Sequence, residues 1–467
     1  MYGVWAILKL IYVLIIAFLL GNSAVGAFSS SPISEEIAEN NSIEDNWSMY
    51  MHDANHTGAS KYTVPDKVSV KWKANIIDGG YVTAGITLYK GKVFAGTWDT
   101  LVYGDNWSAM FGCLDEKTGK SLWNFAAEGY KVQTSCIVND KAYITSTSIG
   151  QQQTDYGVYV YCLDINTGEQ IWRRWFFYTT SYSQPTVADG KVFIGLQEGL
   201  LVAMDAETGE DVWRYQAERL RGAPAVDGKV AYFSCEDGKL YALSTDAKMF
   251  TKFPMLAKPE VKWTCDLGGV GGTPVVYKDR IYIAVGDTLH AIDKNTGKEV
   301  WKTESLGPNL FDPAVAHDNI FIGAGRSFYC LNNEGKTIWK TNYTKAIYSP
   351  PILCGDDRIV FTYGNVGNYT NCTCISQKDG KPIWEINYSA NYNSGIIPCI
   401  GKYGVCVGDW GGNIYLIGFN DTSTSNIGGE KDQTTTIIGI SAVSIIAILA
   451  VAYLVFFRKR FKKTRRL

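Results

Sequence analysis

Histidine is scarce in this 467-residue sequence, which contains only His52, His56, His290 and His317. An enzyme that pairs a histidine base with a nucleophile therefore has few places to start. The eleven cysteines form neither a Cys-x-x-Cys-His haem motif nor the paired Cys-x-x-Cys knuckles of a zinc site. His290 and His317 fall at strand and turn positions of the repeat described below, so we interpret them as structural.

Charged residues and prolines are also few, at 19% of the chain and 13 residues respectively. Hydrophobic residues make up 46% of the chain, aromatic residues 13%, and there are 47 glycines. This composition is typical of a packed, turn-rich globular protein and not of a disordered chain.

The two ends of the chain predict export and membrane anchoring. Lys9, an apolar run and the small residues before Ala27 predict a signal peptide over residues 1–27, with a retained signal anchor as the alternative. Residues 28–45 would form a linker and residues 421–436 a stalk. The uncharged segment 437–457 is long enough for a transmembrane helix. The basic tail 458–467 should stay cytoplasmic, so we predict a single-pass cell-membrane protein with its body outside the cytoplasm.

The exported part is acidic, because leaving out Lys9 and the seven cations of the tail lowers the formal net charge from −2 to about −10. Nucleic acid is therefore not expected as a partner. Nine Asn-x-Ser/Thr sequons favour a glycosylated surface. They lie at Asn40, Asn46, Asn55, Asn106, Asn342, Asn368, Asn371, Asn387 and Asn420.

A repeat sets the expected fold. The segment CLDEKTGKSLW, which ends at Trp123, recurs as CLDINTGEQIW, AMDAETGEDVW, AIDKNTGKEVW, CLNNEGKTIW and CISQKDGKPIW. Related strands bring the repeated tryptophans to eight, with spacings of 38 to 51 residues. These are Trp72, Trp123, Trp172, Trp213, Trp263, Trp301, Trp339 and Trp384. Short alternating strands at this period predict an all-β, eight-bladed propeller over residues 46–420.

The clearest unit predicts four strands at residues 185–188, 191–195, 200–205 and 211–215. Asp-Gly pairs mark the turns, because glycine supplies positive φ and aspartate bonds to turn amides. The last unit lacks a tryptophan strand, whereas residues 68–76 supply one without inner partners. We therefore expect the N-terminal strand to complete the last blade and close the ring.

The units resemble the repeats of pyrroloquinoline quinone (PQQ)-type propellers, and residues 46–60 (NWSMYMHDANHTGAS) are similar to the segment that precedes the repeats in that family. The family includes quinoprotein alcohol dehydrogenases, the propeller lipoprotein of outer-membrane protein assembly and exported proteins that bind no quinone. The resemblance therefore implies the fold more firmly than the function.

The dehydrogenase members imply PQQ and calcium at the top centre of the ring, and a disulfide between adjacent cysteines in their alcohol-oxidising branch. No Cys-Cys pair occurs in this sequence. Asp312 is a conceivable calcium ligand or base, and a turn or channel-lining residue is the simpler interpretation. Four cysteines, Cys113, Cys162, Cys330 and Cys374, occupy an inward slot that alanine fills in other units and predict buried thiols. The remaining cysteines leave room for one disulfide, whose connectivity the sequence does not specify.

Three connections between second and third strands are long, at residues 97–111, 146–158 and 363–371. On a closed ring they would share one sector of the loop face with the last unit. Aromatic residues in this sector could stack on a glycan or a partner protein, or pack against their own loops as a lid. They are Trp98, Tyr103, Trp107 and Trp410.

The sequence thus predicts a non-catalytic surface propeller, without a cofactor or metal, that recognises envelope polymers or partner proteins. A membrane-tethered PQQ-dependent oxidoreductase that uses PQQ and calcium is the alternative. A sensor would need a second chain, because the tail is only ten residues long. The sequence does not identify the ligand, the organism, the oligomeric state or the disulfide connectivity.

Overall fold

The computed structural model describes residues 45–76, 81–82, 85–98, 108–148, 156–181, 183–248, 257–355, 357–364, 370–389 and 396–419. All of them lie in the first of two compact units, Met1–Phe419. The predicted signal peptide, stalk, transmembrane segment and tail, and the linker up to residue 44, fall outside the described residues. Within the ranges given above, no helix has the length and apolar character needed to cross a membrane.

The repeating element is a four-stranded antiparallel sheet, and four such sheets follow one another along the chain. The first matches the strands predicted from sequence to within a residue at each end: β13 (Thr186–Ala188), β14 (Lys191–Gly195), β15 (Leu200–Asp205) and β16 (Asp211–Gln216). The others are β17 (Leu220–Asp227), β18 (Val230–Cys235), β19 (Lys239–Lys248) and β20 (Lys258–Asp266); β21 (Val275–Tyr277), β22 (Arg280–Val285), β23 (Thr288–Asp293) and β24 (Glu299–Lys302); and β25 (Ala314–Ala316), β26 (Asn319–Ala324), β27 (Ser327–Asn332) and β28 (Thr337–Asn342).

Two larger sheets contain the same unit with additions. A six-stranded sheet holds β29 (Ala346–Ile347), β30 (Ile352–Cys354), β31 (Arg358–Gly364), β32 (Thr370–Ser376), β33 (Pro382–Ser389) and the N-terminal β1 (Ala59–Ser60). A ten-stranded sheet joins two runs of four. The runs are β4 (Thr87–Tyr89), β5 (Lys92–Trp98), β6 (Ser108–Asp115) and β7 (Ser121–Glu128), and β9 (Cys136–Val138), β10 (Lys141–Ser148), β11 (Gly157–Asp164) and β12 (Gln170–Phe177).

Two short strands are added to these runs, and the sequence did not predict either of them. They are β3 (Tyr81–Val82), which pairs with β5, and β8 (Lys131–Val132), which pairs with both β5 and β10. Because β8 bonds to strands of both runs, the first two units form one continuous sheet.

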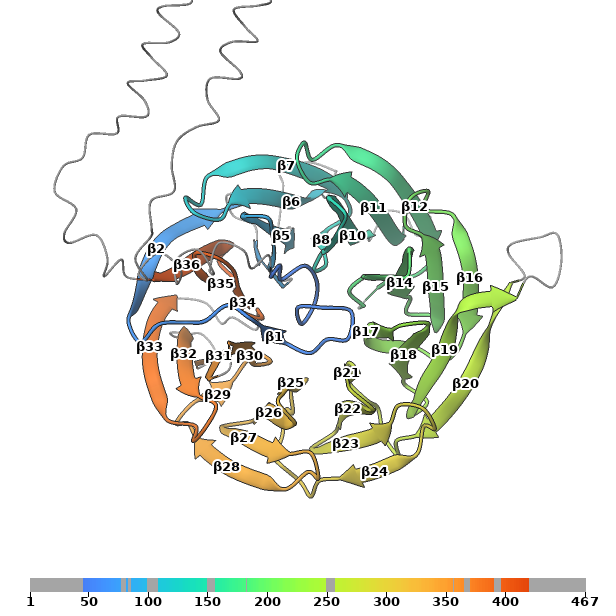
Figure 1. Ribbon diagram of the computed structural model, residues 1–467. Helices are drawn as coiled ribbons and strands as arrows, with labels where there is room; N and C mark the ends of the chain where they lie inside the picture. The colour runs from blue at the N-terminus through green and yellow to red at the C-terminus, as the bar shows by residue number, and fades with distance from the viewer. Residues whose placement is uncertain are drawn as a thin grey trace, which may run out of the picture. The chain divides into compact units, whose positions relative to one another are not determined.

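The N-terminal strand completes the last sheet, as predicted. β2 (Val68–Asn75) pairs antiparallel with β36 (Asn413–Phe419), which continues through β35 (Gly404–Gly408) to β34 (Cys399–Ile400). Figure 1 shows the sheets arranged around a common centre, with β2 beside β36 and next to β33. The chain therefore closes its ring by hydrogen-bonding its two distant ends in one sheet.

The repeated tryptophans join each sheet to the next. Each indole Nε1 donates a hydrogen bond of 2.7–3.1 Å to a backbone carbonyl in the following unit. The pairs are Trp72 to Glu116, Trp123 to Ile165, Trp172 to Ala206, Trp213 to Thr245, Trp263 to Lys294, Trp301 to Asn333, Trp339 to Gln377 and Trp384 to Pro65. Trp384 thus returns to the segment before β2 and completes the circuit.

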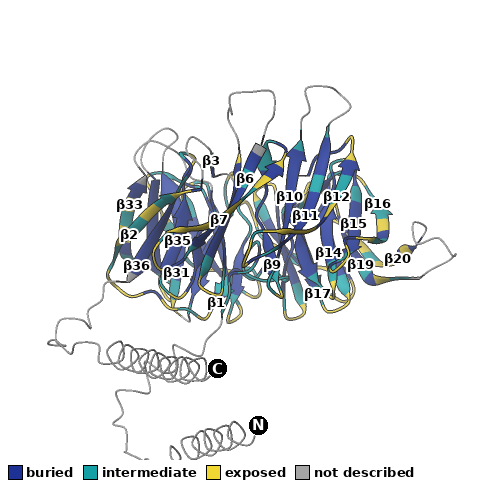
Figure 2. Ribbon diagram, turned by 90° about the horizontal axis from the view of Figure 1, so that it is seen from above, coloured by how far each residue is buried: buried dark blue, intermediate teal, exposed yellow. Residues whose placement is uncertain are grey.

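The hydrophobic core lies between neighbouring sheets. One cluster, for example, combines Cys162 and Trp172 of the second run with Val192 and Met204 of the next sheet. The four inward cysteines predicted as buried thiols are confirmed, since each is at most 1% exposed. Strand alternation explains this success, because inward and outward positions repeat every second residue. Figure 2 shows the buried residues, in dark blue, along much of the length of the strands.

A glycine in the last turn of most units packs against the preceding tryptophan. At Gly209, φ is +71°, and an added β-carbon would lie 2.7 Å from Trp172 Cε3. Gly190 has a similar φ of +67° but no atom within 4 Å of the same position. We expect Gly190→Ala to lower the free energy of unfolding by about 1–2 kcal/mol through backbone strain alone.

Gly209→Ala should cost about 1–3 kcal/mol more, because it adds overpacking against the indole. Urea denaturation of both variants measures the difference between them. Equal losses would show that the glycine–indole contact does not constrain the turn.

Candidate functional site

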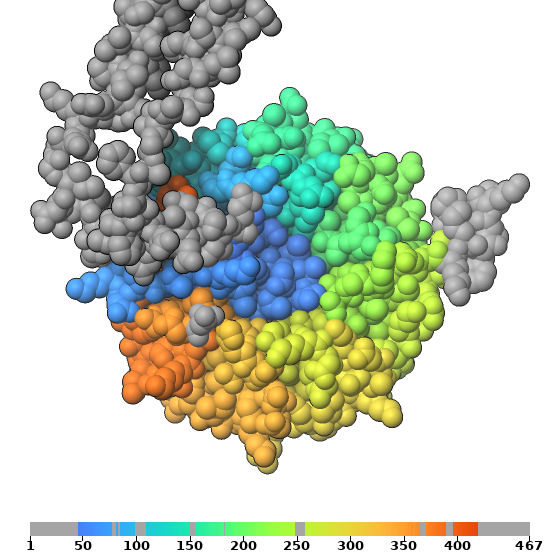
Figure 3. Space-filling view, in the orientation of Figure 1, coloured from blue at the N-terminus to red at the C-terminus, as the bar shows by residue number. Residues whose placement is uncertain are grey.

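The centre of the ring is occupied by the chain's own N-terminal residues 45–60, which we call the central segment. Figures 1 and 3 show these residues, in dark blue, crossing the middle of the ring. Backbone carbonyls of this segment accept hydrogen bonds of 2.7–2.9 Å from amides of inner strands. The donors are the amides of Leu88, Ile137, Val226, Val276, Val315 and Leu353. The segment therefore covers inner sheet edges that would otherwise be open to the channel.

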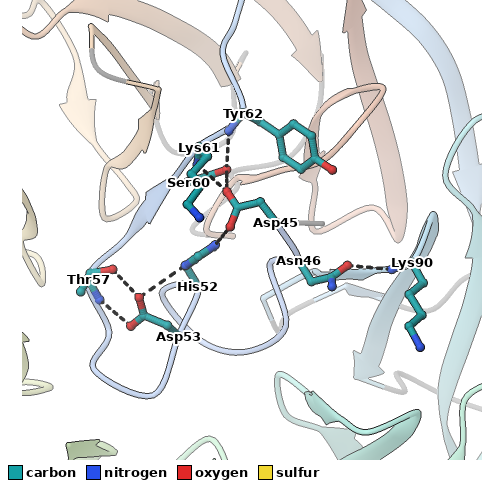
Figure 4. Close-up of polar contacts among 9 residues, drawn as sticks. All are labelled: Asp45, Asn46, His52, Asp53, Thr57, Ser60, Lys61, Tyr62 and Lys90. Carbon is teal, nitrogen blue, oxygen red and sulfur yellow. Dashed lines mark hydrogen bonds and ion pairs between the residues drawn. The ribbon is translucent and has the colours of Figure 1, made fainter. Parts of the chain in front are cut away.

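A half-buried ionic network holds the central segment in shape (Figure 4). His52 Nε2 lies 3.0 Å from Asp45 Oδ1, and its Nδ1 lies 3.4 Å from Asp53 Oδ2. The Ser60 hydroxyl and the Lys61 amide donate to the second oxygen of Asp45. The segment thus forms a loop whose start, middle and end meet at His52 and Asp45.

The network shifts the pKa of each charged partner. Burial alone would lower the pKa of His52, but hydrogen bonds to Asp45 and Asp53 and their charges outweigh it and raise the pKa to about 9. Burial alone would raise the pKa of Asp45, but the bonds from His52 and Ser60 lower it to about 2. At neutral pH His52 is a cation between two carboxylates.

A second set of polar residues joins the central segment to the surrounding sheets. The Tyr50 hydroxyl donates to Asp312 Oδ2 over 2.7 Å, and the Thr273 amide donates to Oδ1 over 3.1 Å. Burial raises the pKa of both Asp312 and Tyr50. His56 is fully buried, its Nδ1 donates to the Pro274 carbonyl, and burial lowers its pKa to about 4, so its ring is neutral.

These residues do not fit a quinone and calcium site. Both oxygens of Asp312 already accept hydrogen bonds from the chain itself, one from the Tyr50 hydroxyl and one from the Thr273 amide, whereas calcium requires several free oxygen ligands. Among the residues that the structure describes, no group of three His, Cys, Asp or Glu side chains is placed to hold a metal ion. Asp312 instead anchors the central segment through Tyr50. The absence of a cofactor stays a prediction.

Two of the four predicted platform aromatics are described, and both are exposed. Trp98 is 42% exposed and forms the end of β5, where the sequence predicted a loop. Its ring lies 6.1 Å from that of Tyr130, and Lys131 Nζ lies 5.7 Å from its centroid. Strand β5 therefore extends further than expected, because pairing with β3 and β8 supports its last residues.

Trp410 is 48% exposed and sits in the predicted turn between β35 and β36. The buried Asp409 carboxylate organises this turn by accepting bonds from the Gly411 amide, the Asn413 amide and the Tyr415 hydroxyl. A rigid turn thus presents the indole to solvent.

Strand β3 lies between the strand that carries Trp98 and the strand that precedes Trp410. Tyr81 pairs with Trp98, and Val82 lies beside Gly408, two residues before Trp410. The two tryptophans therefore belong to neighbouring sheets on the same sector of the ring. Figure 2 places β3 near one rim and β1, the end of the central segment, near the other. The other two platform residues, Tyr103 and Trp107, lie outside the described residues.

Five of the nine sequons are described. Asn342 and Asn387 are exposed, Asn46 and Asn55 are half-buried, and Asn371 is buried with its amide nitrogen 2.7 Å from Glu385 Oε1. Asn371 is thus enclosed in the folded chain, and modification of all five stays a prediction. Asn40, Asn106, Asn368 and Asn420 are not among the described residues.

Sequence reasoning missed the polar residues of the central segment. The only signal was the clustering of two of the four histidines, His52 and His56, with Asp53 in a segment outside the repeat. Tyr50 has a distant partner, since it lies 262 residues from Asp312, whereas the carboxylates that bond to His52 are seven residues away or fewer. His290 and His317 do occupy strand and turn positions, as predicted.

Comparison with known proteins finds one family model, described as "Outer membrane protein assembly factor BamB", that matches residues 109–249 and 255–397. The BamB protein of Shewanella oneidensis is 24% identical over 296 residues, which cover 57% of this chain and 70% of that protein. The BamB protein of Yersinia pestis is 23% identical over 283 residues, which cover 55% and 68%. The chain is thus similar to these proteins over most of its repeats.

Among solved structures, the quinohemoprotein alcohol dehydrogenase of Comamonas testosteroni aligns with 86% of this chain and 85% of its own. The TM-score is 0.60 at 11% sequence identity. At that identity the likeness establishes the β-propeller fold and nothing about activity.

Proposed function

The chain belongs to the family described as outer membrane protein assembly factor BamB, and from that premise we propose that it is a non-catalytic scaffold that binds partner proteins. The family's name describes the assembly of other proteins, and a protein with this role needs a rigid surface to which its partners bind. The central segment supports this role, because it fills the middle of the ring with hydrogen-bonded residues of the chain itself. Specificity would then come from loops at the rim.

The observation that carries the proposal is the pair of exposed indoles, Trp98 and Trp410, that neighbouring sheets hold on one sector of the ring. Large aromatic side chains that are exposed but fixed lose little entropy on binding and often dominate interface energies. Here strand pairing fixes Trp98, and the Asp409 turn fixes Trp410. A glycan or other envelope polymer that stacks on the indoles would use the same surface.

The proposal includes the finer architecture and the cellular setting. The circuit of eight indole hydrogen bonds, which ends at Pro65 before β2, supports a count of eight blades. Export through residues 1–27 and anchoring through residues 437–457 would hold the propeller at the outer side of the cell membrane, where sequons could be modified. These assignments rest on the sequence.

Replacing both indoles should weaken partner binding strongly. We expect Trp98→Ala with Trp410→Ala to weaken capture of a crosslinked partner by the intact membrane-bound chain at least about 30-fold, because a single hot-spot residue contributes about 2 kcal/mol or more. Quantitative mass spectrometry of crosslinked partners measures the loss.

Ile338→Ala is the matched control, since Ile338 is 53% exposed on the outer strand β28 of another sheet and should leave binding unchanged. The melting temperature of each variant checks that the fold is intact. Undiminished capture by a normally folded double variant would remove the indoles from the binding surface.

A further inference from the structure

Two cysteines stand opposite each other in the sheet that closes the ring. Cys399 in β34 and Cys406 in β35 are register partners, and both are fully buried. Gly401 N donates to Gly404 O over 2.9 Å, which makes Gly401 and Gly404 a hydrogen-bonded pair. Such pairs recur at every second position along antiparallel strands, so Cys399 and Cys406 are also a hydrogen-bonded pair. Cα atoms of such a pair are about 5.5 Å apart, which is within the range of about 4.4–6.8 Å seen for disulfides. Their Cβ atoms are about 5.5 Å apart and must approach by about 1 Å for the bond to form, so the two strands have to shift locally.

The register singles out this pair among the eleven cysteines, all of which are described and present as free thiols. In the paired strands, no other cysteine has a cysteine as its direct partner. Cys354 and Cys374 share a core cluster, but β31 separates their strands. Strands two places apart are roughly 9.6 Å from each other, which is too far for a disulfide.

We propose that Cys399 and Cys406 are a modification site, at which a disulfide forms when the chain folds in the presence of a small-molecule or protein disulfide. The thiolate of one cysteine attacks the donor, which leaves a mixed disulfide and releases one donor thiol. The second cysteine then attacks the mixed disulfide, so that the Sγ–Sγ bond forms and the second donor thiol leaves. The two cysteines are oxidised by two electrons, and the donor disulfide is reduced to two thiols.

We expect this thiol–disulfide exchange to take place while the chain folds and not after the ring has closed. In the folded, reduced chain the hydrogen bond with Cys399 and burial hold the pKa of Cys406 well above its ordinary value. Since only thiolates attack disulfides, and both thiols are inaccessible, the closed sheet should exchange very slowly. The redox conditions during folding would therefore fix the state of the pair, and the bond would tie inner strand β34 to β35.

The test is to synthesise the full chain in detergent in a cell-free system with either dithiothreitol or a mixture of oxidised and reduced glutathione. Free thiols are then alkylated under denaturing conditions, and the intact mass and the linked peptides are measured. With dithiothreitol we expect all eleven cysteines to be alkylated. With glutathione we expect two fewer adducts and a peptide that links Cys399 to Cys406.

Matched variants separate this site from adventitious oxidation. Cys354→Ser, which changes a buried cysteine of the same cluster, should keep the loss of two adducts. Cys399→Ser and Cys406→Ala should abolish it. The linked peptide in the unchanged chain is decisive even if a variant folds poorly. Full alkylation after synthesis with glutathione, or a link between other cysteines, would overturn the assignment.

Discussion

Trp213→Ala should lower the free energy of unfolding by about 3–5 kcal/mol, the usual cost of removing a fully buried large aromatic side chain. Trp213 is 1% exposed, and its ring centroid lies 5.9 Å from that of Phe193. Its indole Nε1 donates a hydrogen bond of 2.8 Å to the Thr245 carbonyl. The substitution removes the indole that links these two sheets and leaves a cavity between them.

Trp213→Phe separates packing from hydrogen bonding. The phenyl ring fills much of the space but leaves the Thr245 carbonyl without its indole donor, so we expect a smaller loss of about 1–3 kcal/mol. Urea denaturation followed by tryptophan fluorescence and by circular dichroism measures both variants.

Trp410→Ala serves as the control for the loss of an indole as such, because Trp410 is 48% exposed in a turn. Its free energy of unfolding should change by less than about 0.5 kcal/mol. A Trp213→Ala variant as stable as Trp410→Ala would contradict the role of the repeated indoles in joining the sheets.

The repeat made the fold predictable from sequence. Strands such as β14 and β15 were predicted with their observed bounds, because turn residues such as Asp189-Gly190 and a tryptophan at a fixed place mark this unit. The sequence also predicted that β2 completes the last sheet, because residues 68–76 supply a tryptophan strand without inner partners and the last unit lacks such a strand. Buried thiols such as Cys113 followed from comparing equivalent positions between units.

What could not be predicted lies outside the repeat. Strands β3 and β8 have two residues each, too few for an alternating pattern, and form only because their partners β5 and β10 extend beyond the usual length. The exposure of Trp98 depends on these pairings. Tyr50 bonds to Asp312, which only the folded ring brings beside it, and His52 pairs with carboxylates of its own segment at spacings that form no known motif, so no local pattern signals their roles.

The free energy that holds the central segment should depend on pH through His52. Its pKa of about 9 in the folded chain lies above the ordinary value of 6.5, so the protonated ring stabilises the folded state. That contribution is complete below pH 6.5 and is lost as pH rises through 9. A shift of this size corresponds to about 3 kcal/mol, which is shared with Asp45 and Asp53 and must not be counted again for them.

Hydrogen exchange offers a local measurement of this contribution. The amides of Leu88, Val226 and Val315 are among those that donate to carbonyls of the central segment, so they become exposed when the segment detaches. At pH 7 we expect His52→Gln to speed their exchange about 100-fold, since 3 kcal/mol is roughly that factor. Amides inside β15, such as that of Val202, should change little, because that strand does not contact the segment's carbonyls.

The pH dependence distinguishes charge from shape. Glutamine keeps a hydrogen-bonding group but not the charge, so the ratio of exchange rates between variant and unchanged chain should fall toward one above pH 9, where His52 itself becomes neutral. Asp45 remains ionised throughout this range, because its pKa is about 2. A ratio that stays near 100 at pH 10 would mean that the imidazole holds the segment by packing against Trp47, whose ring lies 5.0 Å away, and not as a cation.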